Sequence, residues 1–133
     1  MQRNPYKGIS PRCWVRIRFA APDGSLHEHD LLADTGSPCA VILGQAELSK
    51  LFHASATSIN SNFGALNGGW LSIEMPELGV TTQVLGFGSD QVLNTVQRDS
   101  PDFAGLIGLP LLRMMEYGGD AASFWLKNIG QPP

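Results

Sequence analysis

The sequence has few cysteines, few charges and no long hydrophobic run. Cys13 and Cys39 are too few for a disulfide framework and lack zinc-site spacing, so we expect reduced thiols. Lysine and arginine total 9 against 12 acidic residues and are scattered, which argues against a basic nucleic-acid-binding surface. No run of about 18 apolar residues occurs, and residues 1–8 contain no apolar segment of signal-peptide length. We therefore expect a cytoplasmic protein that binds neither nucleic acid nor membrane.

Length and composition favour one β-rich domain. A chain of 133 residues is near the usual size of a single domain, so we expect one hydrophobic core, within residues 13–129. The sequence is 43% hydrophobic and holds 15 glycines and 9 prolines, which is typical of a globular protein with many turns. We predict a single all-β domain over residues 1–133.

Apolar alternation and turn residues predict the order of the elements. A hairpin is expected from strands at residues 13–19 and 26–33, joined by a turn at residues 22–25. Asn67-Gly68 predicts the tight turn of a second, glycine-rich hairpin. Further predicted strands cover residues 40–43, 80–87, 103–109 and 123–129. Helical turns are expected at residues 45–52 and, between Pro110 and Gly118, at residues 111–117. Residues 88–102 allow no assignment beyond one short helix.

An acidic motif ends the second strand of the first hairpin. Residues 30–37 read Asp-Leu-Leu-Ala-Asp-Thr-Gly-Ser, and residues 106–108 later read Leu-Ile-Gly. With the glycine-rich residues 64–70 between them, these parts resemble the retropepsin-like aspartic proteases. In that family an Asp-Thr-Gly loop is followed by a flap hairpin, an apolar-apolar-glycine strand and a short helix. The resemblance implies a closed β-barrel with one short helix near the C-terminus.

The resemblance implies that Asp34 is the catalytic acid and base. Peptide hydrolysis needs a carboxylate to activate water and a carboxylic acid to protonate the departing amine. Two adjacent aspartates supply both forms by sharing one proton, and aspartic proteases are the standard example of this effect. The sequence contains one such motif, since the segments at Asp23 and Asp120 lack its threonine and its apolar approach. The resemblance therefore implies a homodimer in which each chain supplies one Asp34.

Other site residues follow from the same resemblance. Thr35 would bond to the partner's loop, Ser37 would bond the outer carboxylate oxygen, and Gly36 would bring backbone groups close to the carboxylate and the substrate. Residues expected to bind substrate are Leu32, Gly36, Leu106 and, at the flap, Ala65, Leu66, Asn67 and Gly68. The resemblance also implies a structural role for Ile107 and Gly108. The implied function is an aspartic endopeptidase that needs no cofactor and cleaves extended peptide or protein substrates at hydrophobic residues.

The sequence departs from the retroviral pattern at two places. Pro38 stands where many retroviral members carry an acid that binds the substrate backbone, so we expect different substrate anchoring. Retroviral dimers interleave their terminal strands, whereas residues 130–133 read Gly-Gln-Pro-Pro and are poor material for a central strand. We therefore expect another dimer interface.

Several alternatives compete with the peptidase hypothesis. His27 and His29 share one face of a predicted strand, but a solvated hairpin explains them and no third ligand is near, so we predict no metal site. The glycines of residues 64–69 lack the Lys-Ser/Thr of a phosphate loop. A retropepsin-like domain can serve instead as a non-catalytic peptide-binding or self-association module. Asp34 can also merely cap a turn through its own backbone.

Overall fold

The computed structural model describes residues 1–61 and 64–129, without the side chains of residues 57, 61, 64 and 65. Strands make up 54% of the structure, which confirms the all-β class. The strands are β1 (Gln2–Pro5), β2 (Trp14–Ala20), β3 (Leu26–Asp34), β4 (Val41–Leu43), β5 (Phe52–Ser61), β6 (Gly64–Met75), β7 (Val80–Gly88), β8 (Phe103–Gly108), β9 (Glu116–Gly119) and β10 (Ser123–Lys127). The helices are α1 (Gln45–Leu51), the 3-10 turn η1 (Pro76–Leu78), α2 (Asp90–Gln97) and α3 (Leu109–Leu112).

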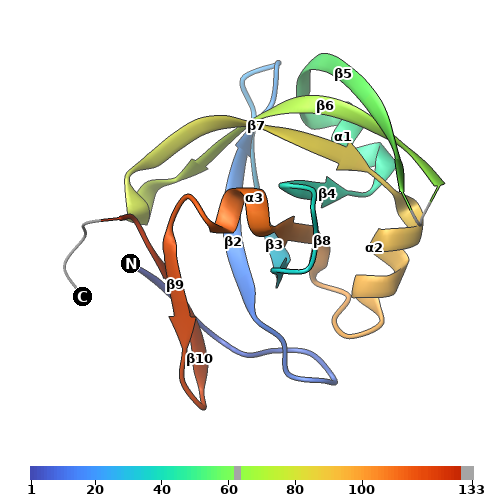
Figure 1. Ribbon diagram of the computed structural model, residues 1–133. Helices are drawn as coiled ribbons and strands as arrows, with labels where there is room; N and C mark the ends of the chain where they lie inside the picture. Colours follow the sequence, from blue (N-terminus) through green and yellow to red (C-terminus); the bar gives the residue numbers. More distant parts are fainter. Residues whose placement is uncertain (62–63, 130–133) are drawn as a thin grey trace.

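Six strands close into a barrel. Neighbouring strands follow the order β2-β3-β8-β4-β7-β6, and β6 pairs back to β2 through Arg18 opposite Glu74 (Figure 1). Strand β5 adds to the outside of β6 and forms a long hairpin with it. The predicted first hairpin is confirmed, because β2 and β3 pair antiparallel from Trp14 opposite Leu32 to Ala20 opposite Leu26. A closed β-barrel is therefore present, as expected.

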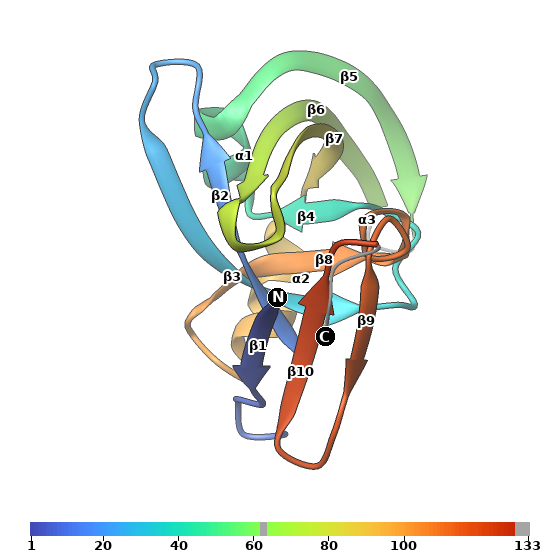
Figure 2. The same cartoon turned by 90° about the vertical axis from the view of Figure 1, so that its left-hand side faces the viewer.

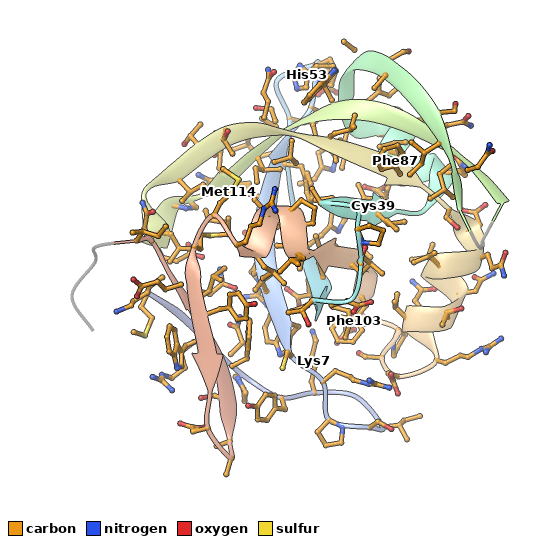
Figure 3. The ribbon with its side chains drawn as sticks, in the orientation of Figure 1. Lys7, Cys39, His53, Phe87, Phe103 and Met114 are labelled. Carbon is orange, nitrogen blue, oxygen red and sulfur yellow. The ribbon has the colours of Figure 1, made fainter. Side chains whose placement is uncertain are left out.

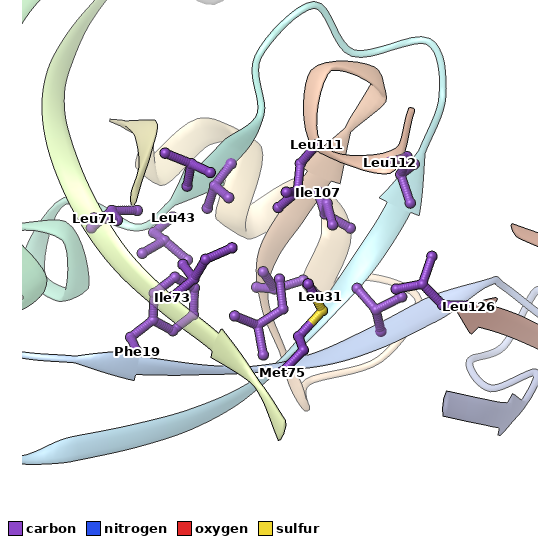
Figure 4. Packing of buried hydrophobic residues seen from close by; sticks show 14 of the residues in the cluster. Phe19, Leu31, Leu43, Leu71, Ile73, Met75, Ile107, Leu111, Leu112 and Leu126 are labelled. Carbon is purple, nitrogen blue, oxygen red and sulfur yellow. The ribbon is translucent and has the colours of Figure 1, made fainter. Parts of the chain in front are cut away.

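The barrel encloses the main hydrophobic core. Along β2, Val15, Ile17 and Phe19 are fully buried, while Arg16 and Arg18 point outward to Asp30 and Glu74, as the period of two requires. Figure 4 shows Phe19 packed with side chains from the other barrel strands. Burial of each large apolar side chain contributes about 1.5–3 kcal/mol, which favours this register over a slipped one.

The glycine-rich segment does not turn where the sequence predicted. Asn67 and Gly68 lie inside β6, opposite Gly88 and Phe87 of β7, so the turn predicted there is wrong. The last described pair of this hairpin is Ser61 with Gly64, and residues 62–63 lie outside the described residues. Strand β6 is paired along both edges, and this pairing outweighs the local turn preference of Asn-Gly.

The glycines of this region leave room for neighbouring side chains. A Cβ on Gly69 would lie 2.7 Å from Cβ of Phe52, and one on Gly86 would lie 2.3 Å from Cδ1 of Leu71. Close packing across the sheet therefore explains why glycine occupies these positions.

The helix near the C-terminus is shorter than predicted. Pro110 stands in its first turn as expected, but α3 ends at Leu112 and residues 116–119 form β9. Gly118, predicted to end the helix, lies against the ring of Trp125 on β10, where its Cβ would approach Cζ2 to 2.6 Å. The second half of the predicted helix therefore forms strand β9, which pairs with β10.

A second, three-stranded sheet contains both terminal strands. Its order is β1-β10-β9, so β10 is paired along both edges within one chain (Figure 2). The sequence analysis missed β1, because its buried residues Gln2 and Asn4 are polar. The Gln2 amide donates to the carbonyl oxygen of Arg16 at 2.9 Å and accepts from the Arg16 amide at 2.6 Å, while Asn4 donates to Trp14. The side chains of Gln2 and Asn4 thus form the hydrogen bonds with the backbone of β2 that a neighbouring strand would otherwise form.

Among the described residues, no helix has the length and apolarity needed to cross a bilayer. Residues 130–133, where we expected no strand, lie outside the described residues.

Candidate active site

The two sequence motifs lie side by side in the barrel. Strands β3 and β8 run parallel, so that Leu32 faces Leu106 and Asp34 faces Gly108 in the register. Residues 106–108 therefore form the strand next to the Asp-Thr-Gly loop. The two strands are far apart in the sequence but both belong to the buried barrel. They therefore hold the loop that follows β3 in a fixed position.

The loop after β3 bends around the carboxylate of Asp34. The amide of Gly36 donates to Oδ1 of Asp34 at 2.9 Å, and the amide of Ser37 donates to the carbonyl oxygen of Asp34 at 3.1 Å. A Cβ on Gly36 would lie 3.2 Å from the same Oδ1, tighter than an ordinary contact. A larger residue at position 36 would therefore make the carboxylate shift by a few tenths of an ångström.

Gly108, at the end of the neighbouring strand β8, holds this loop in place. Its amide donates to the carbonyl oxygen of Ala40 at 2.9 Å, and the next amide, of Leu109, donates to the carbonyl oxygen of Ser37 at 3.1 Å. A Cβ on Gly108 would lie 1.9 Å from the carbonyl oxygen of Cys39, so no other residue fits. Ile107 is fully buried in the main core. The geometry agrees with a structural role for both residues.

Thr35 and Ser37, the two hydroxyl residues of the loop, differ in exposure and in hydrogen bonding. Thr35 is exposed, and among the described residues its hydroxyl makes no hydrogen bond. Ser37 is buried, and its Oγ donates to the carbonyl oxygen of Cys39 and accepts from the Cys39 amide, both at 3.2 Å. The expectation that Ser37 bonds the carboxylate of Asp34 is therefore wrong for this chain, because Cys39 already uses the hydroxyl.

A pocket of about 490 Å³ opens beside Asp34. It is bounded by the loop after β3, the floor strands β3, β4 and β8, the β5–β6 hairpin and helix α2. Its lining residues are Leu32, Asp34, Gly36, Ser37, Pro38, Cys39, Ile42, Ile59, Asn60, Leu66, Val92, Thr95, Val96 and Leu106. This volume lies within the range of small-molecule and side-chain binding sites.

Six of the twelve predicted site residues line this pocket, including Gly36 and Ser37 of the loop. Leu32, Leu66 and Leu106 line it with Asp34, whereas Asn67 and Gly68 do not. The latter two were placed at the flap tip because of the misplaced turn. The side chain of Ala65, the remaining flap residue, lies outside the described part of the chain.

Helix α2 contributes a wall that sequence reasoning missed. Val92, Thr95 and Val96 all line the pocket. The signals for the helix were present: Ser89 caps it by accepting from the amide of Val92 at 3.1 Å, and the two valines are spaced by four residues. Figure 1 shows α2 below the end of the β5–β6 hairpin, which brings Ile59 and Asn60 to the same pocket.

Beneath the pocket lies a second hydrophobic cluster. It contains Cys39, Phe87 and Phe103, labelled in Figure 3, together with Trp14 and the buried valines of α2. Cys39 is therefore both buried and at the edge of the site, and burial raises the pKa of its thiol, which favours the neutral form. The floor of the pocket is thus apolar and well packed.

Asp34 is the one charged side chain among the described residues that line the pocket. The histidines of β3 are engaged separately, His27 with Oγ of Ser25 at 2.8 Å and His29 with Glu47 at 2.9 Å. Within residues 1–61 and 64–129, no group of three His, Cys, Asp or Glu side chains is arranged to hold a metal ion. The arrangement presents one carboxylate at the edge of an apolar cavity.

Comparisons of this chain with protein-family models, with curated proteins and with solved structures found no match.

Proposed function

We propose that the protein is an aspartic endopeptidase that acts as a homodimer on extended peptides. One observation carries the proposal: the Asp34 loop, backed by Gly108, opens onto an apolar pocket covered by a long hairpin. A carboxylate beside a cavity suited to apolar side chains, under a hairpin able to cover an extended chain, supplies one half of a site for peptide hydrolysis.

The chemistry needs two carboxyl groups. The ionised Asp34 of one chain takes a proton from a water molecule as the water oxygen attacks the peptide carbonyl carbon. The protonated Asp34 of the other chain donates its proton to the carbonyl oxygen. As the tetrahedral intermediate collapses, the C–N bond breaks and the nitrogen accepts the proton held by the first Asp34. One hydroxyl of the intermediate returns its proton to the second Asp34, so that a new amine and a new acid leave and the dyad again holds one proton.

The exposed loop supports a dimer built at Asp34. Thr35 lies exposed next to the carboxylate and makes no hydrogen bond with the described part of the chain, which leaves its hydroxyl available to a second copy. Strand β10 is paired on both edges within the chain, so exchange of this strand between copies would first have to break existing pairs. A dimer contact through the Asp34 loop avoids that cost.

A non-catalytic peptide-binding module is the second candidate. The engagement of Ser37 by Cys39 favours it, because the carboxylate of Asp34 then lacks the support expected of a catalytic partner. The pocket itself would serve binding and hydrolysis equally well.

The deciding experiment compares the wild-type protein with Asp34→Asn. Both would be incubated with a mixed peptide library from acidic to neutral pH, and new peptide termini would be read by mass spectrometry. We expect cleavage by the wild type, blocked by a statine-type inhibitor, and none by Asp34→Asn. Asp102→Asn is the matched control, since its side chain is 71% exposed and outside the pocket. No cleavage by a dimeric wild type at any pH would favour the binding module.

A further inference from the structure

The connection between β1 and β2 crosses from the terminal sheet to the barrel. Residues 6–13 form this connection, here called the N-terminal loop, and Figure 1 shows it passing below the segment between α2 and β8. Lys7 and Arg12 close the loop, because the Lys7 amide donates to the carbonyl oxygen of Arg12 at 3.3 Å and the Arg12 amide donates to that of Lys7 at 2.9 Å. Gly8 has φ +108°, which permits the tight turn between them. The loop is therefore an ordered unit with its own hydrogen bonds.

The ammonium group of Lys7 lies against the hydrophobic cluster beneath the pocket. Its Nζ is 4.1 Å from the ring centroid of Trp14 and 5.1 Å from that of Phe103, beside which Figure 3 labels it. It also pairs with Oδ2 of Asp30 at 2.7 Å, and the two side chains are 22% and 15% exposed. Trp14 is the register partner of Leu32, which lines the pocket. Because partial burial strengthens cation–π contacts and ion pairs, Lys7 helps to fix the pocket floor.

The same loop reaches the segment that follows the α2 wall. Nε of Arg12 lies 2.9 Å from Oδ2 of Asp99, and the amide of Ile9 donates to the Asp99 carbonyl oxygen at 2.9 Å. The Asp99 amide in turn donates to the carbonyl oxygen of Val96 at 3.2 Å, and Val96 lines the pocket. The N-terminal loop thus holds the last turn of α2 through one residue.

The N-terminal loop can detach while the barrel stays folded. Residues 8–12 are exposed, the Arg12 side chain is 50% exposed in its ion pair, and Ile9 at the tip is 86% exposed. Segments with so few buried contacts open at a low free energy. Ser89 and Asp90 hold the first turn of α2 independently of the loop. Detachment would therefore free the last turn of α2 and leave its first turn in place.

We infer that the N-terminal loop is a detachable strap that controls access to the pocket beside Asp34. In the docked state Lys7 holds the floor of the pocket, and Arg12 holds the last turn of α2. In the released state that end of α2 is free to move, and the pocket opens. The inference concerns the pocket itself and needs no peptide, so it goes beyond the proposed function and is tested apart from it.

The thiol of Cys39 provides a probe inside the pocket, where this residue is 5% exposed. Cys13→Ser leaves Cys39 as the one thiol of the chain, and N-ethylmaleimide then reports how often the pocket opens. The rate of labelling is followed by mass spectrometry under native conditions. Adding Lys7→Met removes the charge but keeps a long unbranched side chain, and it should raise the rate at least about 10-fold. An unchanged rate would overturn the inference.

Two further variants in the same Cys13→Ser protein separate release of the strap from general effects. Lys7→Arg keeps a cation and should bring the labelling rate back to within about two-fold of that of the parent protein. Arg3→Met removes a cation from β1 whose ion pair with Asp120 is exposed and outside the pocket, and it should leave the rate unchanged. Equal acceleration by Lys7→Met and Arg3→Met would show a general loss of stability and overturn the inference.

A second measurement covers the case in which Lys7→Met disturbs folding. Arg12→Gln removes a half-exposed ion pair, and hydrogen exchange read by mass spectrometry compares residues 91–100 with strand β10. We expect several-fold faster exchange at residues 91–100 and no change in β10. Equal changes in both segments, or none in either, would overturn the inference. Faster labelling of Lys7→Met together with no cleavage by the wild type would leave this inference standing and overturn the peptidase proposal.

Discussion

The α-carbon of Gly108 lies so close to Cys39 that an added Cβ would be 1.9 Å from the Cys39 carbonyl oxygen. This contact joins strand β8 to the loop that carries Asp34. Because the Gly108 amide also bonds the carbonyl oxygen of Ala40, the loop cannot move away without losing a hydrogen bond. The position of the carboxylate therefore depends on a residue that never touches it.

Gly108→Ala should destabilise the protein by about 3 kcal/mol or more, because backbone rather than a flexible side chain would have to shift. Urea unfolding measures the loss. Gly79→Ala is the comparison, since Gly79 has φ +65° but open space around its Cβ position. That change should cost about 1 kcal/mol, from backbone conformation alone. Similar losses for the two variants would show that the contact at Gly108 relaxes easily.

Thr35→Ala should weaken dimer formation without reducing the stability of the single chain. The Thr35 hydroxyl is exposed and makes no hydrogen bond among the described residues, so its removal costs the isolated chain little. Sedimentation equilibrium would show the weaker association, and cleavage per chain should fall with it. Thr81→Ala removes an exposed hydroxyl from β7 and serves as the control. Unchanged association and activity of Thr35→Ala would argue against a bond between the two loops.

Gln2→Ala should cost about 1–3 kcal/mol of stability, because it leaves the amide and carbonyl of Arg16 without their partner. Arg3→Ala on the same strand removes an exposed ion pair with Asp120 and should cost less than about 1 kcal/mol. Urea unfolding of both variants gives the comparison. Equal losses would mean that water replaces the Gln2 side chain without penalty.

The stability of the protein should fall when Asp30 becomes protonated. Burial alone would raise the pKa of Asp30, but hydrogen bonds and attraction from Arg16 and Lys7 outweigh it and hold the pKa below its ordinary value. A carboxyl group with a lowered pKa in the folded state stabilises the fold at pH values above the unfolded pKa. That contribution is lost as the pH falls through the folded value. We therefore expect the loss to begin below about pH 4.

Thermal unfolding from pH 7 to pH 2 tests this expectation with Asp30→Asn. The variant should be less stable than wild type at neutral pH, and the difference should shrink as the solution becomes acidic. Asp102→Asn, with a largely exposed carboxyl group, should follow the wild-type curve. A difference between wild type and Asp30→Asn that stays constant with pH would contradict the assignment.

Local sequence patterns determined much of the barrel. Alternation along residues 13–19 predicted β2, because a half-buried strand repeats every two residues. The Asp-Thr-Gly and Leu-Ile-Gly motifs identified Asp34 and Leu106, which both line the pocket, because the first motif begins at the end of β3 and the second forms the end of its parallel neighbour β8. Where local preference and tertiary pairing agreed, as at the hairpin turn of residues 22–25, the prediction was correct.

The remaining features depend on contacts between distant segments. Asn67-Gly68 forms part of a strand because β5 and β7 pair with it on both sides, and the second half of the predicted C-terminal helix forms β9 because β10 lies beside it. Strand β1 is buried through polar side chains, which no hydrophobic pattern reveals. Ser37 bonds Cys39 because the loop folds back on itself.

The sequence alone thus determined the all-β class, the acidic motif and its glycine support, since these depend on residue type and short spacing. The tertiary structure decided that Asn67 and Gly68 lie inside a strand, that α2 forms a wall of the pocket, and which groups the loop hydroxyls bond. Those outcomes depend on the free energy of pairing and packing between residues far apart in the chain, which exceeds local preference wherever the two conflict.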